Sequence, residues 1–346
     1  MSTRLHTRLH ARLQTRLHAR MHARMHRRLW LQCGVGLATQ LWLPTPARAS
    51  GAVIEGRWTD AARARSLPWR LRLPTGTGPW AWVLFSHGLG GSVDAGTVWG
   101  QAWSAAGLAV LHLQHPGSDT DTLRAGLRQL RSAGSTEQLT ARVQDVHFAL
   151  DEVARLAAQG AAPWSQLDPQ AVGMAGHSFG ALTAQAIAGQ RHPVATRYSD
   201  PRPRAFMAFS PSQPAVALQS LAGAFGGITR PFLAITGSED GDPFGGYDGG
   251  ERRAQVFQGL PPGQRALLWL DGADHMTFAG QDLRRAPAFG PPRRQGPAAE
   301  RQQAHHDLVA RITSDWWRAK LLSDEAARAR LMSPAGLGEN DRWQQG

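Results

Sequence analysis

Short apolar runs alternate with helical patterns along most of this chain, and this alternation constrains its fold more than any other feature. β-Strands are predicted for the apolar runs at 67–73, 80–86, 108–114, 171–175, 205–210, 231–236 and 265–270. Helices are predicted at 97–107, 120–132, 136–158, 179–189, 250–258 and 297–321. This alternation is typical of an α/β domain with a mostly parallel central sheet and helices on both faces.

The pattern divides the 346 residues into a leader at 1–49, one α/β domain at 50–321 and a polar tail at 322–346. No break in composition divides the domain further. The segment at 211–230, between two predicted strands, is too short for a folded cap. We therefore expect one domain without a large cap, followed by a tail of irregular structure.

Most of the net positive charge lies in the leader. Residues 1–49 hold nine arginines and no acidic residue, so they supply nine of the twelve net positive charges. The remainder has a charge ordinary for a soluble domain, which argues against a nucleic-acid-binding body. The single cysteine, Cys33, lies in the leader too. The mature chain is therefore expected to lack disulfides, a thiolate nucleophile and a cysteine-bound metal.

The leader has the order of an export signal. A basic stretch at 26–28 precedes an apolar run at 29–43, and 44–49 ends in Ala-Arg-Ala. We expect the export machinery as a partner, cleavage after Ala49 and a periplasmic or extracellular location, reached by the general or the twin-arginine route. The apolar run is too short for stable membrane insertion. An uncleaved basic tail is the alternative.

A Gly-x-Ser-x-Gly motif stands at 176–180, between a predicted strand and a predicted helix. This context is that of a nucleophile elbow, in which a sharp turn exposes the serine at the start of the helix. Ser178 is therefore the candidate nucleophile. A purely structural glycine turn is the alternative interpretation.

A second glycine-rich loop follows the predicted strand at 80–86. Acyl transfer needs N–H donors for the oxygen that becomes negative in the tetrahedral intermediate. In this architecture, one donor follows the nucleophile and the other lies in the loop after an earlier strand. The backbone N–H groups of Phe179 and Leu89 are the candidates. A plain connection between strand and helix is the alternative for the loop.

A serine nucleophile needs an adjacent base, and His275 is the candidate because it directly follows the last predicted strand. Its neighbour Asp274 is expected to be a loop or turn residue. His305 and His306 lie within the predicted closing helix and are expected at its surface.

The base in turn needs an acid that orients its ring. Three acidic residues follow the predicted strand at 231–236, in the required order between serine and histidine. We favour Asp240 over Asp242, and Glu239 comes third.

These motifs together resemble those of the α/β-hydrolase superfamily, in the branch of bacterial dienelactone hydrolase-like proteins and platelet-activating-factor acetylhydrolase. The resembling segments cover roughly 58–320 and are Trp58 to Arg65 with Leu67-Pro68, FSHGLGGS (85–92), HPGSD (115–119), GHSFGA (176–181), ITGSED (235–240) and GADH (272–275). The resemblance implies an α/β-hydrolase fold and a serine esterase that needs no metal or cofactor. Some members of this branch act on lipids or polyesters.

Two features depart from the family pattern. Dienelactone hydrolase uses a cysteine nucleophile, whereas this motif holds Ser178, so lactone specificity is not implied. The acetylhydrolase places its acid after the strand that follows the nucleophile helix. Here that position reads FSPSQ (209–213) and holds no carboxylate, which moves the expected acid to Asp240.

The sequence thus predicts an exported serine hydrolase that cleaves small-molecule, lipid or polyester esters, with no nucleic-acid partner. Thioesterase or peptidase activity on the same residues is one alternative. An inactive hydrolase-fold binding protein is the other.

Overall fold

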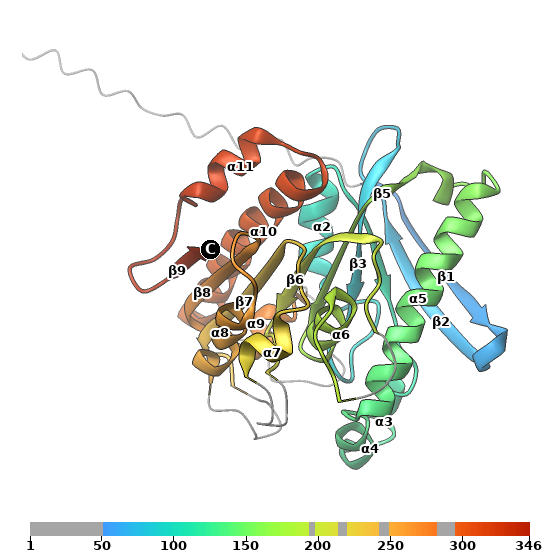
Figure 1. The fold of residues 1–346 in the computed structure, drawn as a ribbon, viewed down its shortest axis with the longest axis horizontal. Helices are drawn as coiled ribbons and strands as arrows, with labels where there is room; N and C mark the ends of the chain where they lie inside the picture. Colours follow the sequence, from blue (N-terminus) through green and yellow to red (C-terminus); the bar gives the residue numbers. More distant parts are fainter. Residues whose placement is uncertain (1–50, 194–197, 214–219, 242–248, 282–294) are drawn as a thin grey trace, which may run out of the picture. The chain divides into compact units, whose positions relative to one another are not determined.

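A nine-stranded β-sheet lies at the centre of the computed structural model (Figure 1). The structure describes residues 51–193, 198–213, 220–241, 249–281 and 295–346. In their order across the sheet, the strands are β1 (Val53–Asp60), β2 (Arg65–Arg72), β4 (Ala109–Leu113), β3 (Trp80–Ser86), β5 (Leu167–His177), β6 (Pro203–Phe209), β7 (Phe232–Glu239), β8 (Arg265–Asp274) and β9 (Arg342–Gln345).

The six strands from β4 to β8 run parallel to one another. At one edge β1 and β2 are antiparallel, and at the other edge β9 is antiparallel to β8. The predicted α/β class with a mostly parallel sheet is therefore confirmed. Because the carboxyl ends of parallel strands share one edge, residues that follow β3, β5, β7 and β8 meet there.

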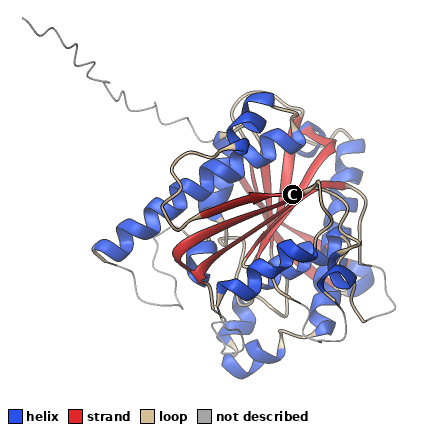
Figure 2. Cartoon of the chain, turned by 60° about the vertical axis from the view of Figure 1, so that its left-hand side comes forward, coloured by secondary structure: helices blue, strands red, loops and turns tan. Residues whose placement is uncertain are grey.

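Helices cover both faces of the sheet (Figure 2). Two short 3₁₀ turns accompany them, η1 (Ala61–Arg63) and η2 (Trp164–Gln166). The helices are α2 (Thr97–Ala105), α3 (Thr120–Arg124), α4 (Leu127–Ser132), α5 (Thr136–Ala158), α6 (Phe179–Ala188), α7 (Leu221–Phe225), α8 (Gly250–Gly259), α9 (His275–Phe278), α10 (Pro297–Leu321) and α11 (Glu325–Met332).

The sheet separates two apolar cores. Along β3, Trp82 and Leu84 pack with α5, α6 and α8, while Val83 and Phe85 pack with α2, α10 and α11. This division follows from the two-residue period of a strand, which turns successive side chains to opposite faces. Among the described residues, no helix is both long enough and apolar enough to cross a membrane.

The tail differs from its prediction. Instead of irregular structure, 322–346 holds helix α11 and strand β9, and β9 pairs with β8 from Ala266 to Trp269. A four-residue polar strand carries no apolar pattern of its own, and the pairing with β8 is what orders it. The edge strand β1 was also missed, because half of its residues are exposed and it lacks a continuous apolar run.

The two histidines of α10 are also placed differently from the prediction. Both His305 and His306 are buried rather than exposed. The ring of His306 packs edge-on against Trp99 of α2, and its Nε2–H donates to the carbonyl of Thr277 at 2.9 Å. They lie on the face of α10 that packs on the sheet, so the prediction of a surface position was wrong.

Candidate active site

Ser178 stands at the turn between β5 and α6, where the backbone is strained. Its φ is 57° and its ψ is −115°, a conformation that costs about 1–3 kcal/mol outside glycine. Its N–H donates to the carbonyl of Phe209 at 2.9 Å, which fixes the turn against β6. A side chain at Gly180 would overlap the carbonyl oxygen of Ser86, and one at Gly176 would overlap that of Gly180. The glycines are therefore what allows this sharp turn, which leaves Ser178 half-buried at the start of the helix.

His275 follows β8 directly and is the first residue of α9. Its Nε2 lies 2.9 Å from the hydroxyl oxygen of Ser178. The carboxylate of Asp274 accepts the N–H of Thr277, and the backbone N–H of Asp274 donates to the Thr277 hydroxyl oxygen. Asp274 is thus a helix cap, consistent with its predicted turn role, and it anchors the segment that carries the imidazole.

His177 gives the imidazole segment a second anchor. Its Nε2 lies 3.0 Å from the carbonyl oxygen of His275. Burial lowers the pKa of His177 well below its ordinary value, and the neighbouring His275 lowers it further. A neutral ring has one N–H, and in this geometry that N–H is on Nε2 and donates to the carbonyl.

Asp240 lies behind His275 and is fully buried. One carboxylate oxygen is 2.8 Å from His275 Nδ1, and the other accepts the hydroxyl of Thr236 at 2.8 Å. The carboxylate therefore holds the proton on Nδ1 and leaves Nε2 as the acceptor that faces Ser178. Glu239 is exposed, and Asp242 lies outside the described residues.

A buried arginine that the sequence analysis missed supports this carboxylate. Arg253 of α8 lies 3.2 Å from Asp240 Oδ1 and donates to the Asp240 carbonyl at 2.8 Å. Its Nη1 donates to the carbonyl of Ser210 at 3.1 Å. A charged partner and backbone acceptors stabilise a carboxylate inside the protein. The available signal was the position of Arg253 on the apolar face of its helix, beside Ala254 and Val256.

The glycine-rich loop after β3 lies against Ser178. A Cβ built on Gly88 would lie 3.0 Å from His177 Nδ1 and 3.3 Å from Ser178 Cβ. Leu89 follows in that loop, and its N–H meets no backbone acceptor within the described residues. Phe179 is the first residue of α6, so its N–H has no acceptor inside the helix. Phe179 thus adjoins Ser178 in the chain, and Leu89 follows the glycine that lies against Ser178.

A second serine, histidine and aspartate lie together inside the fold. His115 Nδ1 is 3.0 Å from Asp145 Oδ2, and its Nε2 is 3.0 Å from the hydroxyl oxygen of Ser86. All three side chains are fully buried. We call this set the buried triad, and we call Ser178, His275 and Asp240 the rim triad.

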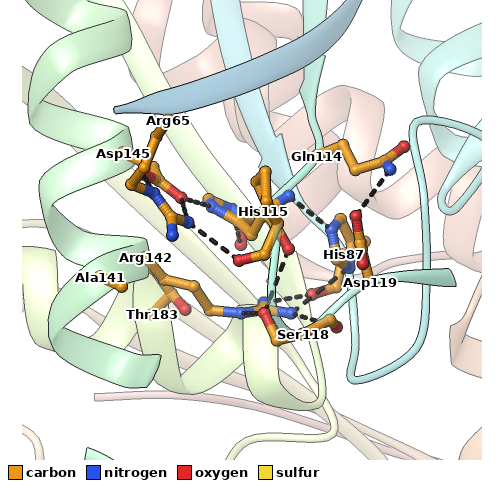
Figure 3. A network of polar contacts seen from close by, with 12 residues as sticks. Arg65, His87, Gln114, His115, Ser118, Asp119, Ala141, Arg142, Asp145 and Thr183 are labelled. Carbon is orange, nitrogen blue, oxygen red and sulfur yellow. Dashed lines mark hydrogen bonds and ion pairs between the residues drawn. The ribbon is translucent and has the colours of Figure 1, made fainter. Parts of the chain in front are cut away.

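The buried triad belongs to a larger polar network beneath the glycine-rich loop (Figure 3). Arg65 donates to Asp145 through Nε and Nη2 at 2.8 and 2.7 Å. Burial alone would raise the pKa of Asp145, but the hydrogen bonds from His115 and Arg65 hold it below its ordinary value. Burial lowers the pKa of His115 to about 4, although Asp145 acts in the opposite direction. The triad therefore holds a neutral imidazole beside a carboxylate at neutral pH.

In the described ranges, no three His, Cys, Asp or Glu side chains are arranged to hold a metal ion. No protein-family model matches this sequence, and a search of curated proteins finds no match. The geometry of the side chains therefore carries the functional argument.

Proposed function

We propose that this chain is a serine hydrolase of the α/β-hydrolase fold that cleaves carboxylic esters through an acyl-enzyme. The observation that carries the proposal is the hydrogen-bonded rim triad, with 2.9 Å from Ser178 to His275 and 2.8 Å from His275 to Asp240. These distances lie within the range needed for proton transfer between a nucleophile and its base. The parallel sheet, which brings the three residues to one edge, supports the proposed fold.

In the proposed reaction, the Ser178 hydroxyl oxygen attacks the ester carbonyl while His275 Nε2 takes its proton. Asp240 stabilises the imidazolium that forms, and the N–H groups of Leu89 and Phe179 bind the developing oxyanion. His275 then protonates the leaving alcohol. His275 next takes a proton from water, which attacks the acyl-enzyme. The ester bond to Ser178 breaks, the carboxylic acid is released, and His275 returns the proton to the serine oxygen. Every step uses residues of this chain alone, with small-molecule, lipid or polyester esters as the substrate class.

A fluorophosphonate probe tests the nucleophile directly, because it reacts covalently with an activated serine. We expect one labelled peptide that contains Ser178, together with turnover of p-nitrophenyl butyrate. The Ser178→Ala variant is expected to lose both signals. Absence of labelling and turnover in the unaltered chain would indicate an inactive binding protein. Faster turnover of matched thioesters or amides would instead favour a thioesterase or a peptidase.

We also propose that the protein is exported and cleaved after Ala49. The leader at 1–49 lies outside the described residues, so its order of basic, apolar and small residues is the whole support for this proposal. N-terminal sequencing of the exported protein tests it, and a mature chain that still begins with the arginine-rich leader would contradict it.

A further inference from the structure

A buried arginine of α5 contacts the glycine-rich loop that lies against Ser178. Arg142 is fully buried, and its Nη1 donates to the carbonyl of His87 at 2.6 Å. Its Nη2 lies 3.4 Å from the carbonyl oxygen of Gly88, at the long end of hydrogen bonding. Its Nε donates to the Ser118 hydroxyl at 2.8 Å. One guanidinium thus meets two consecutive carbonyls of the loop. Figure 3 shows Arg142 beside His87 and Ser118.

The same guanidinium also contacts the residue that carries the second proposed donor. Its carbon lies 4.3 Å from the centre of the Phe179 ring, a cation–π distance. Arg142 therefore contacts the loop that contains Leu89 and the side chain of Phe179. The backbone N–H groups of these two residues, Leu89 and Phe179, are the proposed donors to the substrate oxygen.

Peptide planarity links these contacts to the direction of the Leu89 N–H. In a trans peptide, the carbonyl of one residue and the N–H of the next point in opposite directions. The Gly88 carbonyl accepts from His87 Nδ1–H at 2.6 Å and from the N–H of Gly91 at 3.1 Å, besides its contact with Arg142. Because that carbonyl is directed into the buried network, the Leu89 N–H is directed away from it.

Burying the charged guanidinium of Arg142 costs free energy, so the groups that accept its hydrogen bonds matter. Burial lowers the pKa of Arg142 to about 9, so the group remains charged at neutral pH. A buried cation is stable only where its donors are satisfied, and the nearby carboxylates of Asp145 and Asp119 favour the charged form of Arg142. Among the described residues, Arg142 donates to the carbonyls of His87 and Ser118 and to the Ser118 hydroxyl. The charge is therefore satisfied directly by the glycine-rich loop and the segment beside it.

We propose that Arg142 is a positioning residue that fixes the Gly88–Leu89 peptide so that the Leu89 N–H faces the substrate oxygen. This inference rests on the proposed serine-hydrolase function. Loss of one such donor lowers the rate by about 10²–10³-fold. A loop that only loses its support keeps part of that stabilisation, so we expect a smaller effect, about 10- to 100-fold, in Arg142→Met.

The expected loss is in kcat, because the oxyanion forms only in the transition state. In Arg142→Met, kcat for p-nitrophenyl butyrate should fall while KM stays within about twofold. The inhibition constant of a trifluoromethyl ketone, which forms a tetrahedral adduct with the serine, should rise by the factor by which kcat falls. Arg142→Lys offers one nitrogen in place of three and should show an intermediate loss. It decides the question if Arg142→Met does not fold.

Arg230 provides a matched control at the opposite end of β6. It too donates to backbone carbonyls, those of Asp200 and Pro203 at 2.6 Å each, and its guanidinium lies 4.8 Å from the Phe206 ring centre. Arg230→Met should lower the unfolding temperature and leave kcat unchanged.

Three results would overturn the inference. These are an unchanged kcat in a folded Arg142 variant, a change confined to KM, and an equal loss of kcat in Arg230→Met. A wild-type chain without labelling or turnover would instead overturn the proposed function and this inference with it.

Discussion

The rim triad and the buried triad contain the same three residue types, with almost the same hydrogen-bond distances between them. From serine to histidine they measure 2.9 and 3.0 Å, and from histidine to aspartate 2.8 and 3.0 Å. Yet we propose only the rim triad as a site of chemistry. The comparison teaches that a hydrogen-bonded serine, histidine and aspartate do not by themselves make a nucleophile.

The difference lies in the backbone around each serine. Ser178 has a strained turn conformation at the start of α6 and is half-buried. Ser86 ends an extended strand and is fully buried, so no ester can reach its hydroxyl. Helix α6 also presents a free N–H next to Ser178, where an oxyanion would form. Access and oxyanion donors therefore separate the two triads.

The largest difference in kcat is expected between two single variants, in each of which one of the two serines is replaced by alanine. Ser178→Ala should lower kcat by about 10⁴- to 10⁶-fold, because nucleophile and base act as one unit. Ser86→Ala should keep kcat within about threefold and cost about 1–3 kcal/mol of unfolding free energy, since it leaves a buried imidazole nitrogen unpaired. Parallel ester assays and urea titrations of both variants measure this. Equal loss of turnover in the two would break the distinction.

The aspartates of the two triads are expected to differ in the same way, one affecting kcat and the other the free energy of unfolding. Asp240→Asn should lower kcat by about 10⁴-fold, because an amide no longer holds the imidazole in the reactive tautomer. Asp145→Asn should act on stability, by about 3–5 kcal/mol, because it removes a fully buried carboxylate that pairs with the half-buried Arg63 and Arg65. Steady-state kinetics at a temperature where both variants are folded separate these outcomes.

Asp242→Asn is the control for the choice of acid. We expect it to retain nearly wild-type kcat. A loss comparable with that of Asp240→Asn would contradict the assignment of the acid to Asp240.

A smaller effect concerns pH and the buried triad. Burial lowers the pKa of His115 from 6.5 to about 4. Between these values the unfolded chain binds a proton that the folded chain does not, so the free energy of unfolding falls as the pH falls. From pH 7 to pH 5 this one group should remove about 2 kcal/mol.

Urea titrations of wild type and His115→Gln at pH 7, 6 and 5 measure this loss. The variant should lose less stability over the interval than the wild type, although its other buried histidines still contribute. An identical pH dependence in the two proteins would show that His115 is not held neutral by the fold.

The central part of the fold was predictable because its strands are continuous apolar runs. The prediction at 80–86 coincides with β3, and those for β4 and β6 to β8 differ mainly at their ends. The structure also brings Ser178, Asp240 and His275 together, as their positions after three of the parallel strands predicted. Such residues are accessible to sequence reasoning because parallel strands present their carboxyl ends at one edge.

The polar residues behind the site were not predicted, for a different physical reason. Arg142 and Asp145 lie on the apolar stripe of α5, among Leu139, Val143 and Val146. A charged residue on such a stripe indicates a buried partner, but the partner comes from a distant segment that the period of the helix does not identify. The same holds for Arg253 and His306.

The edge strands β1 and β9 were not predicted from the sequence because pairing with a neighbouring strand, rather than an apolar pattern, orders them.

The glycines around Ser178 set the limits for anyone who wishes to redesign this protein for another ester. A replacement at Gly176 or Gly180 would collide with main-chain atoms, and one at Gly88 would press on the serine itself. Mutant libraries should therefore hold these three positions constant and randomise residues farther along the loops, where a new side chain reshapes the substrate's surroundings without displacing the nucleophile.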